Sequence, residues 1–92
     1  WQHYTNFGNV QYSRTSEGIV FIRGTCRRGK TTKETVLFTL PEKYRPSVGL
    51  FKKALNNSYG SAIIAIYPTG NVVVKDNVDD QWLNLDDISF KI

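Results

Sequence analysis

Short apolar segments, separated by turn-forming residues about every 8–12 positions, constrain the fold of this chain more than any other feature. The segments span residues 10–14, 18–25, 34–40, 49–55, 61–67, 71–75, 81–85 and 87–91. Apolar and polar residues alternate along most of them, as in strands with one buried face. The best helix candidate, residues 50–56, is too short to be convincing. The spacing therefore predicts an all-β fold, either an antiparallel sandwich or a barrel.

The last two segments are predicted to form two short strands joined by a tight turn. Leu83 and Leu85 fall on one face of the first strand, and Ile88 and Phe90 fall on one face of the second. This alternation predicts that all four side chains are buried. The chain is therefore expected to end inside its own sheet.

The 92-residue length bounds the organisation of the protein. A chain of this size builds one core, so residues 1–92 are predicted to be a single domain. The chain contains no methionine, and we expect it to be cut from a longer protein as its C-terminal part. Cys26 is the single cysteine, which excludes an internal disulfide. No apolar run reaches about 18 residues, so no membrane-spanning helix is predicted.

Charge is unevenly distributed along the chain. Residues 1–53 carry ten Lys/Arg against three Glu, or +7, whereas residues 54–92 carry two Lys against five Asp, or −3. Such asymmetry suits an anionic partner or packing between subunits. Ordinary solvated loops explain it equally well.

Residues 24–31 match the phosphate-binding pattern G-x-x-x-x-G-K-[ST] in full. That mechanism requires a helix after the loop, so that its first amides hold the phosphate. Residues 31–40 are instead β-branched and alternating, which predicts a strand. We therefore interpret the match as accidental and the segment as an exposed basic loop. Arg27, Arg28 and Lys30 are predicted to contact an anionic ligand there.

No catalytic, cofactor or metal site is predicted. His3 is the only histidine, and Cys26 has no base near it in the sequence. Asp76, Asp79 and Asp80 lack the spacing of a calcium loop. The sequence therefore favours a binding protein over an enzyme.

The aromatic residues divide into three predicted groups. Core positions in strands are predicted for Phe21, Phe38 and Phe90, and anchoring roles for Tyr44 and Trp82. Tyrosine can pack its ring while its hydroxyl stays in water, which suits sugar stacking at a rim. On this ground Tyr4, Tyr12, Tyr59 and Tyr67 are the candidates, and we assign Tyr59 and Tyr67 to ligand binding.

Two segments, residues 19–22 and 62–66, are apolar on both faces. A solitary two-sheet sandwich normally exposes its outer faces to water, so such strands suggest additional cover. A second copy of the chain is the favoured source of cover, which predicts a subunit interface. Its residues are Val20, Ile22, Ile63 and Ala65. A central strand in a twisted barrel is the competing explanation.

Four segments carry a family resemblance. They are GIVFIRG (18–24), FTLPEKYRPS (38–47), AIYPTGNV (65–72) and WLNLDDISF (82–90). Together they resemble the C-terminal head domain of tail-fibre and baseplate receptor-binding proteins from phages and prophages of Gram-positive bacteria. Lys43 and Asp87 stand where that family usually has glycine, and Asn84 stands where it usually has serine.

The resemblance implies a single antiparallel β-sandwich of jelly-roll-like type, which assembles as a homotrimeric head at the virion tail tip. This head would attach to a bacterial glycopolymer, either wall teichoic acid or a polysaccharide. Other tail-fibre or baseplate proteins would be partners through the preceding part of the protein. The motifs look architectural: Tyr44, Arg45, Pro46, Trp82, Asp86 and Phe90. Arg45 is expected to pair with a carboxylate such as Asp86.

Three alternatives are retained. The first is a trimerisation cap without receptor contact. The second is a monomeric carbohydrate-binding module of a wall hydrolase. The third, a basic barrel for single-stranded nucleic acid, ranks last because most aromatics fall on apolar strand faces. We accordingly expect no nucleic-acid partner and no membrane insertion.

Overall fold

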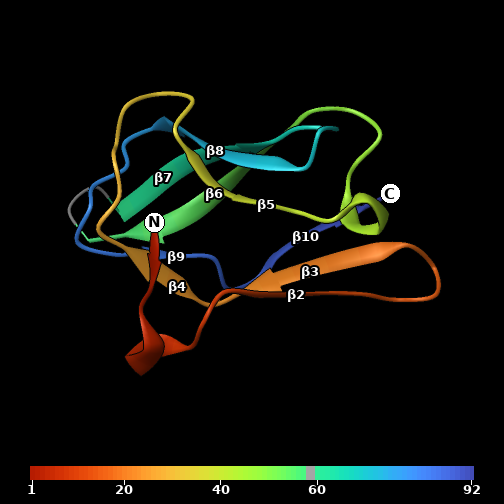
Figure 1. The fold of residues 1–92 in the computed structure, drawn as a ribbon, viewed down its shortest axis with the longest axis horizontal. Helices are drawn as coiled ribbons and strands as arrows, with labels where there is room; N and C mark the ends of the chain where they lie inside the picture. Colours follow the sequence, from red (N-terminus) through yellow and green to blue (C-terminus); the bar gives the residue numbers. More distant parts are fainter. Residues whose placement is uncertain (58–59) are drawn as a thin grey trace.

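The computed structural model describes residues 1–57 and 60–92, which form an all-β fold (Figure 1). The strands are β1 (Gln2–His3), β2 (Gln11–Arg14), β3 (Ile19–Arg23), β4 (Thr25–Arg27), β5 (Val36–Thr39), β6 (Leu50–Asn56), β7 (Gly60–Ile66), β8 (Asn71–Asp76), β9 (Leu83–Asn84) and β10 (Ile88–Lys91). Two 3₁₀ turns, η1 (Thr5–Phe7) and η2 (Glu42–Tyr44), complete the described elements. The strand β1 and the turn η1 were not predicted from the sequence.

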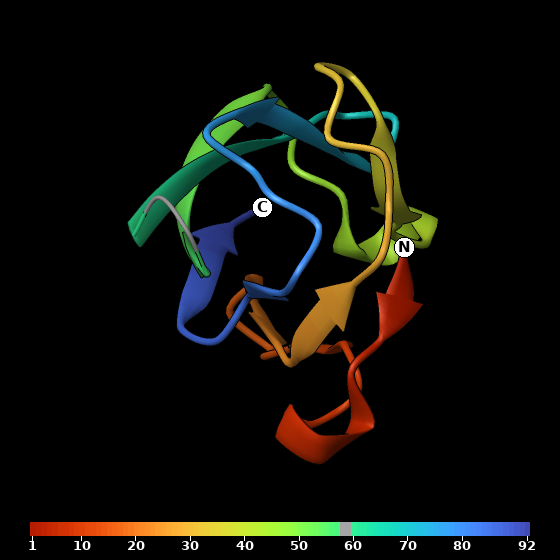
Figure 2. The same cartoon turned by 90° about the vertical axis from the view of Figure 1, so that its left-hand side faces the viewer.

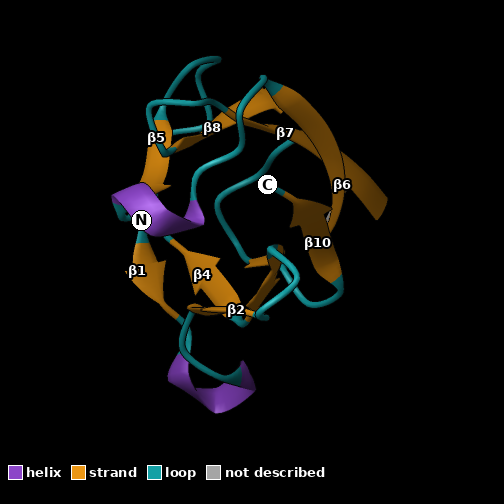
Figure 3. Cartoon of the chain, turned by 90° about the vertical axis from the view of Figure 1, so that its right-hand side faces the viewer, coloured by secondary structure: helices purple, strands orange, loops and turns teal. Residues whose placement is uncertain are grey.

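The strands form two antiparallel sheets. The larger has the order β1-β4-β9-β6-β7-β8-β5, and the smaller has the order β10-β3-β2. Viewed end-on, the large sheet curls and the small sheet faces it across a shared interior (Figures 2 and 3). The last strand pairs with β3, with Phe90 opposite Val20, so the chain ends inside a sheet as predicted.

Alternating residues of both sheets fill the interior. In β7, Ala62, Ile64 and Ile66 are fully buried. The predicted core residues of the closing strands are buried as well: Leu83, Leu85, Ile88 and Phe90. Period-two alternation therefore predicted this part of the core correctly.

The predicted strand over residues 18–25 is divided at Gly24. The residues before Gly24 belong to the small sheet, and those after it belong to the large sheet. Its φ of +110° lies in a region that side chains rarely adopt, and a Cβ there would lie 2.3 Å from the carbonyl oxygen of Asn9. Glycine therefore permits both the change of sheet and the close passage of the N-terminal segment.

The face predicted for residues 34–40 needs correction. The period-two pattern predicts that Val36, Phe38 and Leu40 share one buried face. Val36 is exposed, and Leu37 is buried instead. The register with β8 shifts between Val36 and Phe38. An irregularity of this kind exchanges the two faces of a strand, and the sequence pattern does not reveal it.

The predicted subunit interface is also corrected. Val20 and Ile22 are buried in the core of the single chain, and Ala65 is only 1% exposed. Ile63 is half-buried. Val20, Ile22 and Ala65 therefore do not form a free surface, and the apolar character of their strands does not require a second copy at these positions.

The aromatic predictions are partly confirmed. Phe90 is buried and Phe38 is half-buried against the core, but Phe21 is 46% exposed on the outer face of β3. Tyr44 anchors the corner as predicted: it packs against the core, and its ring lies 4.9 Å from that of Tyr12.

Arg45 does not reach Asp86. Its Nε donates a hydrogen bond to the carbonyl oxygen of Leu40 at 2.9 Å. The side chain also passes close to Gly70, where a Cβ would lie 2.5 Å from the Arg45 Nε. The predicted Arg45–Asp86 pair is therefore wrong: Arg45 instead hydrogen-bonds to Leu40 and lies against Gly70 in the turn between β7 and β8. Within residues 1–57 and 60–92, no helix has the length and apolar character needed to cross a membrane.

Candidate functional site

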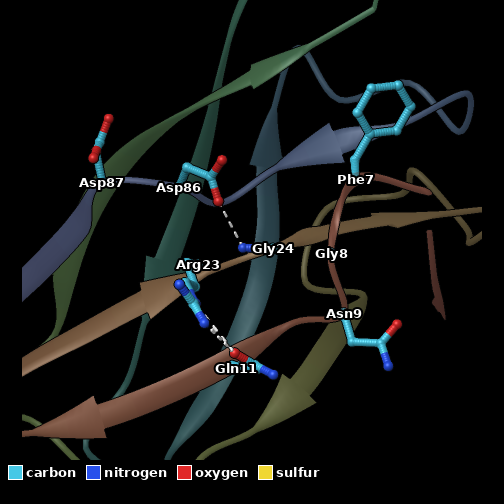
Figure 4. A pocket seen from close by; sticks show the side chains of 8 residues that line it. All are labelled: Phe7, Gly8, Asn9, Gln11, Arg23, Gly24, Asp86 and Asp87. Carbon is cyan, nitrogen blue, oxygen red and sulfur yellow. Dashed lines mark hydrogen bonds between the residues drawn. The ribbon is translucent and has the colours of Figure 1, made fainter. Parts of the chain in front are cut away.

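An open groove of about 560 Å³ lies where the N-terminal segment meets the turn between β9 and β10 (Figure 4). Its lining residues come from three parts of the chain: Phe7, Gly8, Asn9, Gln11, Arg23, Gly24, Asp86 and Asp87. Gly24 brings these parts together, because its amide and carbonyl contact the closing turn while its Cα faces the N-terminal segment.

Hydrogen bonds fix two walls of this groove. The Gly24 N–H donates to Asp86 Oδ1 at 2.8 Å, and Asn84 Nδ2 donates to the other Asp86 oxygen at 3.3 Å. On the opposite side, Arg23 donates through Nε and Nη2 to Gln11 Oε1, at 3.1 and 2.9 Å (Figure 4). The groove therefore presents carboxylate, guanidinium and amide groups in set positions.

The Phe7 ring borders the groove and is 63% exposed. It extends from η1, and the ring of Tyr4 supports it edge-to-face at a centroid distance of 4.9 Å. A supported aromatic ring with one open face can stack on the apolar face of a sugar. Sugar hydroxyls would then meet the polar walls described above.

Asp87 occupies a left-handed backbone conformation, with φ of +68°. Aspartate tolerates this region better than most residues, although glycine is the usual choice. The turn therefore keeps a glycine-like geometry with a carboxylate added at its tip. In Figure 4 that carboxylate points away from Asp86, and it has no hydrogen-bond partner among the described residues.

Two further hollows are linked to this groove by shared lining residues. Phe7 also borders a hollow of about 290 Å³ lined by Thr25, Leu55, Trp82 and Asn84. Trp82 in turn borders a third hollow of about 390 Å³, whose other lining residues are Tyr4, Arg27, Arg28, Asn57, Asp80 and Gln81. We call the three hollows together the aromatic track, because Phe7 and Trp82 link them.

Strand pairing explains the middle of the aromatic track. Thr25 of β4 and Leu55 of β6 both pair with Asn84 of β9, so the three side chains share the outer face of the large sheet. Asn84 Nδ2 donates to Thr25 Oγ1 at 2.9 Å. Leu55 is 55% exposed and gives this hollow an apolar floor.

The predicted ligand-binding residues do not all come together. Arg27 and Arg28 both line the third hollow. The carbonyl oxygen of Lys30 accepts a hydrogen bond from the Trp1 indole, and Lys30 lines none of the three hollows. Tyr59 lies outside the described residues. The prediction therefore locates two arginines of the track.

Tyr67 lies in a separate polar cluster on the outer face of the large sheet. Its hydroxyl donates to the Glu34 carboxylate, which also forms an ion pair with Lys75. The hydrogen bonds from Lys75 and then Tyr67 lower the pKa of Glu34. These three side chains satisfy one another, so Tyr67 is not part of the aromatic track.

Sequence reasoning missed Phe7, Arg23 and Gln11 as site residues. The N-terminal segment that carries Phe7 has no alternating pattern, so it gave no structural prediction. The available signal was the sequence Phe7-Gly8-Asn9, an aromatic residue directly before a turn-forming pair.

The structure shows whether residues 24–31, which match the phosphate-binding pattern, are followed by a helix. Between residues 24 and 41 the chain forms β4, a loop and β5, with no helix after Thr31. The match is therefore accidental, as predicted. Among the described residues, no group of three or more His, Cys, Asp or Glu is placed to hold a metal ion.

Cys26 is buried, with its Sγ 3.8 Å from the Leu83 carbonyl oxygen. Burial raises the pKa of this thiol to about 12. We expect a thiol reagent at pH 8 to label the native protein at least about a hundredfold more slowly than the urea-unfolded protein, because the thiolate is the reactive form. Rates measured with and without urea test this. Equal rates would contradict the burial.

Comparisons with protein-family models, with curated proteins and with solved structures give no match to this chain.

Proposed function

We propose that this domain is the receptor-binding head of a phage tail fibre or baseplate, and that it attaches the virion to a glycopolymer of the bacterial surface. The observation that carries the proposal is the aromatic track, in which Phe7 and Trp82 link three open hollows. A linear polymer can lie along such a surface without entering an enclosed pocket. The resemblance of the four sequence segments supports the same assignment.

The side chains along the track suit sugar recognition. The ring of Phe7 offers an apolar platform, while Asp86, Arg23 and Gln11 supply hydrogen-bonding groups beside it. Shallow sites of this kind bind weakly one at a time. A head with several copies converts weak contacts into stable attachment through effective concentration.

We further propose that the working unit is a homotrimer at the virion tail tip, built from jelly-roll-like sandwiches. Two sheets around one core support the sandwich assignment. The exposed ring of Phe21, on the outer face of β3, is available for contact between copies. Other tail-fibre or baseplate proteins are the proposed partners.

One alternative is favoured by a specific observation. Val20 and Ile22 are covered by the chain itself, which fits a monomer. A monomeric carbohydrate-binding module of a wall hydrolase would have the same track.

Adsorption of the isolated domain to Gram-positive cell walls tests the proposal. We expect the domain to sediment with walls. If extraction of the teichoic acid abolishes adsorption, teichoic acid is the receptor, and if adsorption persists after extraction, the receptor is a polysaccharide. Light scattering should give three times the chain mass of 10.5 kDa. A monomer that adsorbs favours the hydrolase module, and a trimer that adsorbs to no wall supports the cap without receptor contact.

A further inference from the structure

We propose that the third hollow of the aromatic track is an anion subsite, which binds a phosphate or carboxylate group carried by the polymer. This inference rests on the proposed function. Two guanidinium groups, from Arg27 and Arg28, line the hollow together with the single carboxylate of Asp80. The formal charge of these groups is +1, so an anionic group of a ligand is favoured there over a neutral one.

Arg27 packs against Tyr4, and its positive charge is not neutralised by a described residue. Its guanidinium carbon lies 4.0 Å from the centroid of the Tyr4 ring, a cation–π arrangement that covers one face of the group. Its Nε is buried without a hydrogen-bond partner, and within the described part of the chain its guanidinium forms no ion pair. The Nη atoms of Arg27 form no hydrogen bond with a described residue, so these atoms, unlike the buried Nε, keep donors for a ligand anion.

Arg28 adopts a backbone conformation that disfavours a side chain. Its φ is +61°, and its N–H donates to the Asp80 carbonyl oxygen at 2.8 Å, which holds the turn in place. Glycine would adopt this conformation without strain. An arginine kept at a strained position, with no side-chain partner among the described residues, points to a use for the side chain.

The position of Trp82 in this hollow is also fixed. The indole Nε1 of Trp82 donates to Asn57 Oδ1 at 2.9 Å, so the ring position is set by a hydrogen bond. Trp82 borders both the second and the third hollow. A sugar stacked on this ring would place a substituent beside the arginines.

The two ends of the aromatic track differ in charge. The first hollow has Asp86 and Asp87 against Arg23, a formal charge of −1, whereas the third has +1 from Arg27, Arg28 and Asp80. An anionic group is therefore repelled from the first hollow and attracted to the third. This difference orients the polymer, with neutral hydroxyl-rich sugar in the first hollow.

Titration with inorganic phosphate, followed by NMR at the Trp82 indole N–H, tests the subsite directly. We expect a saturable shift in the wild-type protein and its loss in Arg28→Gly. This variant relieves the left-handed backbone, so its melting temperature should equal or exceed that of the wild type. Arg28→Lys keeps the charge without the planar fork and should retain part of the shift.

Lys53→Gln is the matched control, because it removes one positive charge from the exposed outer face of β6. It should leave the Trp82 shift unchanged. If Lys53→Gln and Arg28→Gly reduce the Trp82 shift equally, the shift depends only on the net charge of the protein and the proposal is overturned. The absence of any shift at Trp82 in the wild type would overturn it as well.

Two polymers then separate the sources of the anion, namely poly(glycerol phosphate) and polygalacturonate. Arg28→Gly should weaken binding of the preferred polymer about tenfold or more and leave binding of neutral cell-wall polysaccharide unchanged. If binding of neither polymer depends on Arg28 while adsorption to walls persists, the anion subsite is refuted and the proposed function stands. If phosphate shifts Trp82 but the domain adsorbs to no wall, the subsite stands and the proposed function fails.

Discussion

Replacing Gly24 by alanine should destabilise the domain by about 2–5 kcal/mol, through backbone strain and overpacking together. The added Cβ would lie 2.3 Å from the Asn9 carbonyl oxygen and 2.6 Å from the Val10 Cα. Both are backbone atoms, so no side-chain rotation relieves the contact. A domain of this size is stable by roughly 5–14 kcal/mol, so the loss is a large fraction of the total. Urea unfolding followed by tryptophan fluorescence measures it.

Gly60→Ala is the control for this prediction. Gly60 also has a positive φ, +74°, but a Cβ there meets nothing within 4 Å. Alanine at position 60 therefore introduces the backbone strain without the contact. It should lower the free energy of unfolding by only about 1–2 kcal/mol. Equal losses of unfolding free energy in the two variants would mean that the N-terminal segment does not pass close to Gly24.

Phe7→Ala should weaken binding of the wall glycan about tenfold or more, because loss of a stacked ring removes roughly 0.5–1.5 kcal/mol beyond its contact area. Phe7 is 63% exposed, so the free energy of unfolding should stay within about 0.5 kcal/mol of the wild type. Calorimetric titration with the purified polymer measures the affinity.

Phe51→Ala is the matched control for binding. Phe51 is 72% exposed, but it lies on β6 opposite Ala65, away from the three hollows. Its removal should leave the affinity of the isolated domain unchanged. A similar loss in both variants, or a loss in Phe51→Ala alone, would place the glycan around Phe51 on β6 instead of along the aromatic track.

Local patterns predicted the strands well where one face is buried. The alternation in residues 83–90 gave the buried side chains of the closing strands correctly. It failed at Val36, where a register irregularity exchanges the faces. It also missed the break at Gly24, because an unbroken apolar run does not show which sheet each half joins.

The candidate site was only partly predictable, because distant segments build it. Gly24 and Asp86 are hydrogen-bonded across 62 positions of sequence. The loop sequence identified Arg27 and Arg28 as a basic pair, but its prediction that both are exposed holds only for Arg28, because Arg27 is half-buried against Tyr4. The sequence also did not indicate that Trp82 lines the same hollow. The doubly apolar strands predicted a subunit interface at Val20 and Ile22, since the sequence does not show how far one sheet curls over the other.

An NMR titration of the isotope-labelled domain with the wall glycan to which it adsorbs tests directly whether the aromatic track is the glycan-binding surface. We expect backbone and indole signals to shift along the aromatic track, in residues 4–9, 23–28 and 80–87. The signals of Phe51, Tyr67 and Lys75 should stay in place. Shifts confined to that second group, or no shifts at a glycan concentration that saturates adsorption, would contradict the assignment of the track as the glycan-binding surface.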